Sequence, residues 1–380
     1  MRALIVDQSR DRSALVAARM LRADGWEVGT GAWRPTIGAT SAATVAYHQI
    51  EEAETDEDRF IADIAAAVQA GGYEIVFCNY DVGLLVLSRR RAEIAPAIVP
   101  YGAHEVVERS FDKLAFTRAA ESVGLGVPRT EEASDQALAS WPGALVVKAR
   151  IHAPTRFETR RFDSAAEAAP FVADLRARGA QPLLQECITG QLGAVVVVVD
   201  RDGEVIAEVQ QRCDRSWPAD AGITARARTI VPDEELSERA RELVRQLEWF
   251  GLAEIEYLLD DQGVPRFTDF NGRFYGGIAL AYRAGVNVAG AWARLATGRP
   301  LGPIAPQRVG ARFQWLNRDL AASFHADGLR GLARALALAP GSAHSMLARG
   351  DLGPLLRFYL PEGARRAAAR AGIFRGSVEA

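Results

Sequence analysis

One hairpin constrains the fold of this chain more than any other stretch. Two short apolar arms, residues 253–259 and 264–270, flank an Asp-Asp-Gln-Gly turn, and this pattern predicts two antiparallel strands. If the connecting loop has four residues, the pairing places Glu256 opposite Asp269, and Asn271 follows two residues further along the same face. Two carboxylates opposed on a sheet repel each other, so the pair predicts a cation between them.

The chemistry of these side chains indicates which cation would fit. Oxygen ligands without neighbouring sulfur or imidazole suit Mg²⁺, with Mn²⁺ as a substitute, because these ions keep their other positions for water and phosphate oxygens. Arg273 follows directly, and a guanidinium suits the oxygens of a phosphate or a carboxylate. The alternative is a solvated hairpin whose acidic side chains point into water. The hairpin sequence leaves both interpretations open.

Composition excludes several classes of protein. A chain of 380 residues can form two or three domains, and a net charge of −3 with a pI near 6.1 favours neither nucleic acid nor an anionic membrane as a partner. The longest apolar run, residues 194–199, is too short to span a bilayer, and the first residues resemble a strand rather than a signal peptide. Cys78, Cys187 and Cys213 are too scattered for a disulfide framework or a zinc site. We expect a cytoplasmic protein.

The first hundred residues alternate between strand and helix patterns. Apolar segments at residues 3–7, 26–33 and 74–78 are separated by helical patterns, which predicts an open parallel sheet. The first strand-to-helix turn lacks Gly-x-Gly-x-x-Gly, so a dinucleotide site is not expected there. Asp81 follows the third of these strands, where it could contact substrate or cap the next helix.

The strand–helix alternation of the first hundred residues ends near Ser110. A helical pattern over residues 110–123 is followed by a strand, residues 143–148, that ends in Lys148. A lysine that closes an apolar strand is costly unless it meets an anion. A further strand ends in Gln185 and Glu186, and residues 193–211 have the pattern of another hairpin.

These motifs together resemble the ATP-grasp superfamily. The resemblance covers about residues 110–296 and rests on Asp112-Lys113, Gly126-Val-Pro128, Val146-Val-Lys148, Gln185-Glu186 with Gly190, Glu256, and Asp269-Phe-Asn271-Gly-Arg273. It implies an α/β (α+β) ATP-grasp fold with an N-terminal parallel-sheet domain over residues 1–109. The ATP-grasp domain would cover residues 110–305, with a lid at about 131–212 and an antiparallel C-terminal core. Residues 306–380 would form a helical extension.

The resemblance also implies roles for individual residues. Lys113 and Lys148 would hold the nucleotide phosphates, and the adenine would contact the hinge formed by Gln185, Glu186, Cys187 and Ile188. Glu256, Asp269 and Asn271 match the magnesium ligands, and Arg273 matches the arginine that steadies the transferred phosphoryl group. Phosphoryl transfer needs cations around the γ-phosphate and little else from the protein, so the residue chemistry agrees with these roles.

Arginines further along the chain are candidates for binding a substrate carboxylate. Residues 210–226 resemble an ATP-grasp branch related to the carbamoyl-phosphate-synthase type, in which an arginine-bearing strand leads to a loop near the acceptor site. Arg212, Arg215 and Arg226 are the candidates on this resemblance, with Arg212 assigned a catalytic role. The alternative is that they are surface arginines on the edge of a hairpin.

Three positions depart from the family pattern. Asp269 stands where glutamate is more usual, which shortens its reach but keeps its charge. The loop after Lys148 lacks the usual glycines, so Arg150, His152 or Arg156 would have to supply the contacts to phosphate. Leu192 stands where many relatives place a ribose-binding glutamate, which leaves the nucleotide preference open.

The function implied is an ATP-dependent carboxylate–amine ligase. Mg-ATP would phosphorylate a substrate carboxylate, and an amine would attack the acyl phosphate to form an amide, with release of ADP and phosphate. The alternatives are a kinase acting on a carboxylate or carbamate, and an ATP-binding regulator without turnover. We expect small-molecule carboxylate and amine substrates and a homodimer, the commonest assembly of such enzymes. The basic segment 365–375 could dock a partner or a lipid surface, or form a solvated terminal helix.

Overall fold

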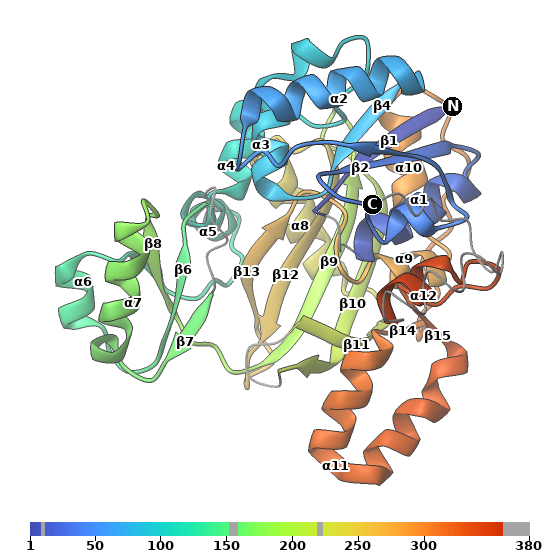
Figure 1. The fold of residues 1–380 in the computed structure, drawn as a ribbon. Helices are drawn as coiled ribbons and strands as arrows, with labels where there is room; N and C mark the ends of the chain where they lie inside the picture. Colours follow the sequence, from blue (N-terminus) through green and yellow to red (C-terminus); the bar gives the residue numbers. More distant parts are fainter. Residues whose placement is uncertain (9–11, 152–158, 219–222, 360–380) are drawn as a thin grey trace.

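The described residues form three sheets, each with its own helices. The computed structural model describes residues 1–8, 12–151, 159–218 and 223–359. Figure 1 shows the N-terminal sheet at the top, a smaller sheet at the left and the largest sheet in the centre, with a helical hairpin projecting below it. In the described parts of the chain, no helix combines the length and the apolar character that crossing a bilayer requires.

The N-terminal sheet is parallel, as its sequence pattern predicts. Its strand order is β3-β2-β1-β4, with the strands β1 (Arg2–Val6), β2 (Glu27–Ala32), β3 (Thr44–Gln49) and β4 (Ile75–Cys78). The helices are α1 (Arg12–Ala23), α2 (Glu57–Gly71), α3 (Asp81–Arg89) and α4 (His104–Phe111), with short 3₁₀ turns η1 (Gly38–Thr40) and η2 (Arg91–Ile94). The sequence analysis missed β3, an edge strand with mostly polar, half-buried residues and no apolar alternation.

The smaller sheet lies in the stretch predicted to be the lid, and we call it the lid sheet. It is antiparallel, in the order β5-β8-β6-β7, and consists of β5 (Thr130–Glu132), β6 (Leu145–Ala149), β7 (Arg160–Phe162) and β8 (Pro182–Glu186). The helices α6 (Asp135–Ser140) and α7 (Ala165–Ala177) accompany it, and its buried residues form a cluster separate from the main core. The lid sheet ends at Glu186 rather than near residue 212, because the next two strands pair into the central sheet.

The central sheet has the order β13-β12-β9-β10-β11-β14-β15. Its strands are β9 (Gln191–Val199), β10 (Val205–Trp217), β11 (Ile223–Thr229), β12 (Gly251–Leu259), β13 (Pro265–Asn271), β14 (Arg312–Gln314) and β15 (Ser342–Ala343). The five successive valines of β9 are fully buried, which requires cover on both faces and explains why β9 is an inner strand. The accompanying helices are α5 (Lys113–Ser122), α8 (Glu234–Gln246), α9 (Ile278–Arg283) and α10 (Val288–Ala296).

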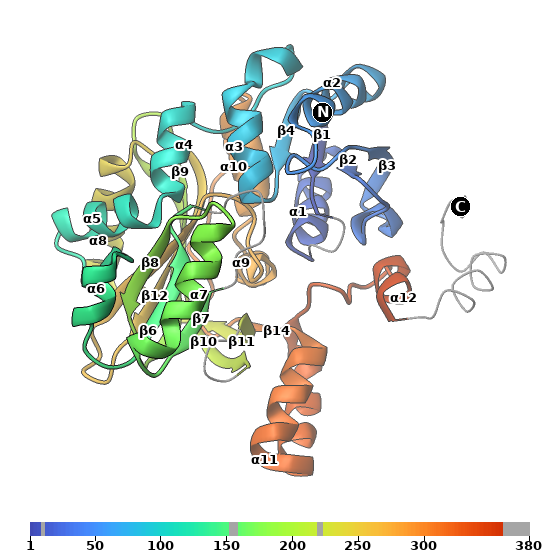
Figure 2. The same cartoon turned by 60° about the vertical axis from the view of Figure 1, so that its left-hand side comes forward.

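The C-terminal extension combines a helical hairpin with two short strands of the central sheet. Helix α11 (Leu316–Leu338) is broken at Gly328, whose φ of 59° interrupts the helical backbone. This break divides the first part of the helical extension into two helical segments. The two arms are seen apart in Figure 1 and one behind the other in Figure 2. The turn η3 (Ala339–Gly341) and the helix α12 (Gly353–Tyr359) follow. The basic segment 365–375 lies outside the described residues.

The extension returns to the N-terminal domain through Asp351. This buried carboxylate accepts hydrogen bonds from Arg19 Nε at 2.8 Å, from Ser41 Oγ at 2.6 Å and from the backbone nitrogen of Ala42 at 2.9 Å. Burial lowers the pKa of Arg19, and Asp351 opposes that shift. The contact therefore joins residues more than 300 positions apart in the sequence.

We expect Asp351→Ala to lower the free energy of unfolding by roughly 3 kcal/mol, because Arg19 would stay buried without its partner. Chemical denaturation measures this loss. Asp135→Ala is the matched control, since it removes an ion pair with Arg176 in which the aspartate side chain is 91% exposed, and it should cost less than about 1 kcal/mol. Equal losses in the two variants would contradict a structural role for the Asp351 contact.

Candidate active site

The hairpin β12–β13 forms the predicted pair of acidic residues. Glu256 lies opposite Asp269, as predicted, and Glu254 lies opposite Asn271. Near the turn, however, Leu259 rather than Asp260 pairs with Pro265. Between these two parts of the ladder, β13 contains a bulge with one extra residue. The bulge compensates for the difference at the turn, so Glu256 still pairs with Asp269 although the loop is not the one assumed.

Four polar side chains therefore share one face of the hairpin. Residues two apart on a strand point the same way, which places Glu254 and Glu256 of β12 beside Asp269 and Asn271 of β13. The sequence analysis did not single out Glu254, although the spacing Glu-x-Glu on a predicted strand was the signal for it. Asn271 Nδ2 donates to Glu254 Oε2 at 3.2 Å.

Both lysines of the chain lie at this face. All but two of the 45 basic side chains are arginines, and the exceptions are Lys113 and Lys148. Lys113 begins α5 and donates to Asp269 Oδ1 at 2.7 Å, while Lys148 at the end of β6 donates to the carbonyl oxygen of Thr268 at 3.0 Å. Both are buried. The cation expected beside the acidic pair is therefore the Lys113 ammonium in this structure.

The charges in this cluster perturb one another. Burial, reinforced by Asp269, raises the pKa of Glu256 to about 7. Burial, opposed by Asp269 but reinforced by Lys113, lowers the pKa of Lys148 to about 8. Burial and the neighbouring Glu256 raise the pKa of Glu254 well above its usual range. Such opposed shifts within one cleft are typical of sites that bind charged ligands.

A cavity of about 870 Å³ lies between the lid and the central sheet. Its polar side contains Lys148, Glu256 and Asp269, and its other walls include the predicted hinge residues Gln185, Glu186, Cys187 and Ile188 together with Leu192 and Leu258. The volume is in the range usual for small-molecule sites. The cavity thus brings together Lys148, the pair Glu256 and Asp269, and the predicted hinge residues, and Lys113 contacts Asp269 at its edge.

The hinge strand ends inside this cavity. The side chain of Gln185 donates to Thr130 Oγ1 at 2.9 Å, so its amide nitrogen is used within the lid. Strand pairing of β8 stops at Glu186, and the backbone of Cys187 and Ile188 continues beyond the ladder along the cavity wall. A wall of this kind offers backbone groups and apolar side chains to a planar ring.

Arg273 connects the cleft to the N-terminal domain. Its guanidinium pairs with Asp81 through Nε, and Nη2 lies 3.4 Å from Asp81 Oδ2. The helix α3 has Tyr80 at its N-cap position and no side-chain cap, so Asp81 does not act as the cap that the sequence allowed. Asp81 instead orients Arg273 at the carboxyl end of β4, where open α/β sheets place their ligands.

The three candidate substrate arginines lie in different places. Arg215 lines the cavity, where Nη1 also donates to the carbonyl oxygen of Ala322 at 3.3 Å. Arg226 forms an ion pair with the fully buried Asp319 of α11, with a shortest distance of 2.9 Å, and therefore ties the extension to the sheet. The strand β11 is an inner strand, so the interpretation of Arg226 as a surface arginine at a hairpin edge is wrong.

The catalytic role predicted for Arg212 needs correction. Arg212 pairs across the sheet with Gly193, which in turn pairs with Tyr257, whereas Gln211 and Glu256 both pair with Ala194. Neighbouring rows of a sheet point to opposite faces, so Arg212 lies on the face opposite to Glu256. Burial raises the pKa of Tyr257, and the positive charge of Arg212 partly offsets this rise. Arg212 therefore interacts with Tyr257 on the far face and not with the residues of the cleft.

The lid loop after Lys148 is only partly described. Arg150, one of the proposed substitutes for the missing glycines, pairs with Asp112 at 2.7 Å and with Glu132 at 3.0 Å. It therefore joins the lid to the start of α5 and is not available to phosphate in this arrangement. His152 and Arg156 lie outside the described residues.

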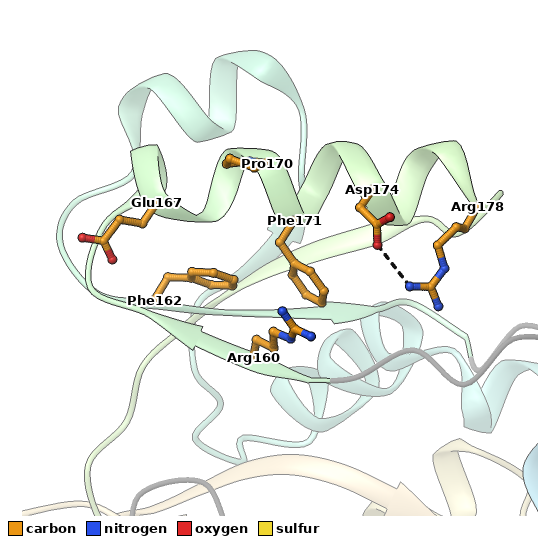
Figure 3. A pocket seen from close by; sticks show the side chains of 7 residues that line it. All are labelled: Arg160, Phe162, Glu167, Pro170, Phe171, Asp174 and Arg178. Atoms are coloured by element: carbon orange, nitrogen blue, oxygen red, sulfur yellow. Dashed lines mark hydrogen bonds and ion pairs between the residues drawn. The ribbon is translucent and has the colours of Figure 1, made fainter.

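A second, shallower pocket lies within the lid itself, between β7 and α7 (Figure 3). Arg160 lies over the ring of Phe171, with its guanidinium carbon 4.7 Å from the ring centre, and Phe162 packs beside the same ring. The acidic residues at its rim are spread along α7 rather than gathered at one point (Figure 3). None of the predicted site residues lines this pocket.

The donor set on the hairpin fits magnesium. Two carboxylates and an amide oxygen are hard donors, and Mg²⁺ usually takes only one or two protein carboxylates beside water and phosphate oxygens. Among the described residues, no group of three or more His, Cys, Asp or Glu side chains has the geometry to hold a metal by itself. A site with two carboxylates and one amide oxygen leaves the other positions of Mg²⁺ to water and phosphate oxygens.

A small sheet, an acidic hairpin and the strand β8 around one cleft are the arrangement expected of an ATP-grasp fold, and comparison with known proteins agrees on the fold. The family model described as "ATP-grasp in the biosynthetic pathway with Ter operon" matches residues 180–319. Residues 180–319 therefore match an ATP-grasp family model, and the fold of the chain is that of ATP-grasp proteins. No curated protein sequence matches it.

Three solved structures show the likeness of fold. The biotin carboxylase of Campylobacter jejuni, titled as a β-γ-ATP complex, has a TM-score of 0.64 at 17% identity, covering 81% of this chain and 74% of its own. The L-amino acid ligase of Bacillus licheniformis has a TM-score of 0.64 at 15% identity over 80% and 78%. The N5-carboxyaminoimidazole synthetase of Staphylococcus aureus, complexed with ADP, has a TM-score of 0.61 at 12% identity over 83% and 82%.

Proposed function

We propose that this protein is a Mg-ATP-dependent ligase that joins a small carboxylate to an amine. The observation that carries the proposal is that Lys148 and the Glu256–Asp269 pair line one cleft, with Lys113 bound to Asp269. Two of the structural neighbours are titled as complexes with ATP or ADP, and another as an L-amino acid ligase. The expected homodimer and the cytoplasmic location remain predictions.

The first step is transfer of the γ-phosphoryl group. A carboxylate oxygen of the substrate attacks the γ-phosphorus, and the bond from this phosphorus to the oxygen that bridges it to ADP breaks. Lys148 and Lys113 neutralise the phosphate oxygens, and Arg273 steadies the transferred group. A magnesium ion held by Glu256, Asp269 and Asn271 would supply further positive charge to the phosphates. For this step Lys113 must exchange Asp269 for a phosphate oxygen.

The second step forms the amide. The amine nitrogen attacks the acyl carbon, phosphate leaves with the former carboxylate oxygen, and the nitrogen loses a proton. No nucleophilic side chain is needed, and closure of the lid would exclude water that hydrolyses the acyl phosphate. Of the three candidate arginines, Arg215 is the one that lines the cavity, and it could bind a substrate carboxylate there.

A turnover experiment tests this proposal. The purified protein is incubated with ATP, Mg²⁺ and pooled carboxylates and amines, and both the nucleotide product and new masses are resolved. We expect ADP only when both pools are present, with a mass equal to a condensation product. AMP would contradict an acyl phosphate. Tight ATP binding without turnover would favour a regulator, and ADP with the carboxylate pool alone would favour a kinase.

A further inference from the structure

The acidic hairpin holds a third carboxylate, that of Glu254, which the steps above do not use. Glu254 is buried, and the described residues give it no ion pair. Each of its oxygens accepts one hydrogen bond from a neutral amide: Oε1 from Gln211 Nε2 at 3.1 Å and Oε2 from Asn271 Nδ2 at 3.2 Å. Burying a carboxyl group whose hydrogen-bond partners are all neutral amides costs folding free energy. This cost is a reason to expect a function of Glu254 in holding its neighbours in position.

The contact with Asn271 fixes the orientation of its side-chain amide. In the structure Asn271 turns its NH₂ group toward Glu254, because Nδ2 is the atom that donates to Oε2. The carbonyl oxygen Oδ1 then points away from Glu254. Because Glu256 and Asp269 are the next pair along the same face, this orientation makes Oδ1 available to a cation at that pair.

The hydrogen bond from Gln211 in turn holds the side chain of Glu254 in position. Gln211 belongs to β10, and its side chain reaches Glu254 across β9 on the same face of the sheet, where the small Ala194 lies between Gln211 and Glu256. Gln211 is itself buried. The result is a chain of hydrogen bonds from the middle of the sheet to the amide of Asn271.

We propose that Glu254 is a positioning residue for the metal site: it orients the Asn271 amide so that its oxygen faces the cation bound at Glu256 and Asp269. Partners of this kind commonly contribute as much as tenfold to a hundredfold to metal affinity by orienting the ligands. The inference rests on the proposed function only in taking the Glu256–Asp269 pair as the cation site.

Two conservative variants separate position from charge. Glu254→Asp keeps the charge but shortens the side chain by one methylene, which withdraws the acceptor from Asn271. Glu254→Gln keeps the length, and its Oε1 can still accept from Asn271. Its new amide nitrogen needs an acceptor, and Gln211 Oε1, a buried oxygen without a partner in the described structure, can supply it if the Gln211 amide turns over.

The test follows Mn²⁺ by electron paramagnetic resonance in the complex of the protein with a non-hydrolysable ATP analogue. We expect Glu254→Asp to weaken Mn²⁺ binding by about tenfold and to change the zero-field splitting of the bound ion, since one ligand is lost. Glu254→Gln should stay within about threefold of the wild type. Thermal unfolding of both variants checks that the fold is intact.

Three other results would contradict the role proposed for Glu254 or the metal site itself. If Glu254→Gln is the weaker binder and Glu254→Asp is normal, then Glu254 acts through its charge and not by positioning. If both variants bind Mn²⁺ like the wild type, the residue has no part in the metal site. If the wild-type protein with the analogue binds no Mn²⁺, the proposed function fails first, and the variants are not needed to show it.

Discussion

Glu256→Gln should lower Mg²⁺-dependent ATP turnover by at least about 10²-fold, since the cation loses the carboxylate that faces the centre of the site. The same change should not destabilise the ligand-free protein. The pKa of Glu256 is raised to about 7 from 4.5, mainly by burial, so the fold favours the protonated form. Wild-type stability therefore falls as the pH rises from about 4.5 to 7, and the variant escapes that loss.

Steady-state kinetics with chemical denaturation at pH 8 measures both effects. Asp261→Asn is the matched control, because Asp261 is an exposed carboxylate in the turn of the same hairpin. It should leave turnover unchanged. Unchanged turnover in Glu256→Gln would remove this residue from the metal site, and lower stability would contradict the predicted cost of ionising Glu256 in the ligand-free protein.

Lys148→Met is expected to weaken ATP binding and to stabilise the ligand-free protein. The loss of a charge-assisted contact to phosphate should lower ATP affinity by roughly 10- to 100-fold. Burial lowers the pKa of Lys148 from 10.5 to about 8, so the protein binds this proton less tightly when folded. Removal of the buried charge should therefore raise the free energy of unfolding at pH 7 by about 1–3 kcal/mol.

The pH dependence has a definite sign. Between pH 8 and 10.5 the unfolded chain keeps the Lys148 proton that the folded protein has lost. Lys148 should therefore make the free energy of unfolding of the wild type increase between pH 8 and 10.5. The Lys148→Met variant should not show this increase. ATP affinity should fall in the wild type as the pH increases through about 8, since the charged lysine binds phosphate.

The scarcity of lysine makes this prediction directly measurable. Labelling with lysine ¹³C-enriched at Cε gives two side-chain signals, one each for Lys113 and Lys148, and Lys113→Met assigns them. We expect one signal to titrate near pH 8 in the free protein and at a higher pH with ATP bound. Titration of both signals near 10.5 in the free protein, or a Lys148→Met variant with normal ATP affinity, would contradict the account.

The acidic hairpin shows how far local pattern could predict this site. Turn composition and period-2 alternation predicted Glu256 opposite Asp269, and this pairing forms although the register assumed at the turn was one residue off. They could not reveal the bulge that produces this pairing, because strand alternation gives no sign of one extra residue. They also could not show that Lys113 neutralises Asp269, a contact between residues 156 positions apart.

The arginines show where the same reasoning fails. Arg212, Arg215 and Arg226 carry similar local patterns, but their surroundings depend on which strands lie beside them and on the alternation of faces across the whole sheet. Only the sheet order places Arg212 on the far face and Arg226 against Asp319. The lid boundary was misplaced for the same reason, since β9 and β10 look like lid strands until their partners are known.

The fate of the substrate's carboxylate oxygen tests the central claim most directly. The protein is incubated with ATP, Mg²⁺, amines and carboxylates labelled with ¹⁸O, and the mass of the released inorganic phosphate is measured. An acyl phosphate transfers one carboxylate oxygen to phosphate, so we predict phosphate carrying a single ¹⁸O. Consumption of ATP with formation of the amide but with unlabelled phosphate would contradict the mechanism proposed for this site.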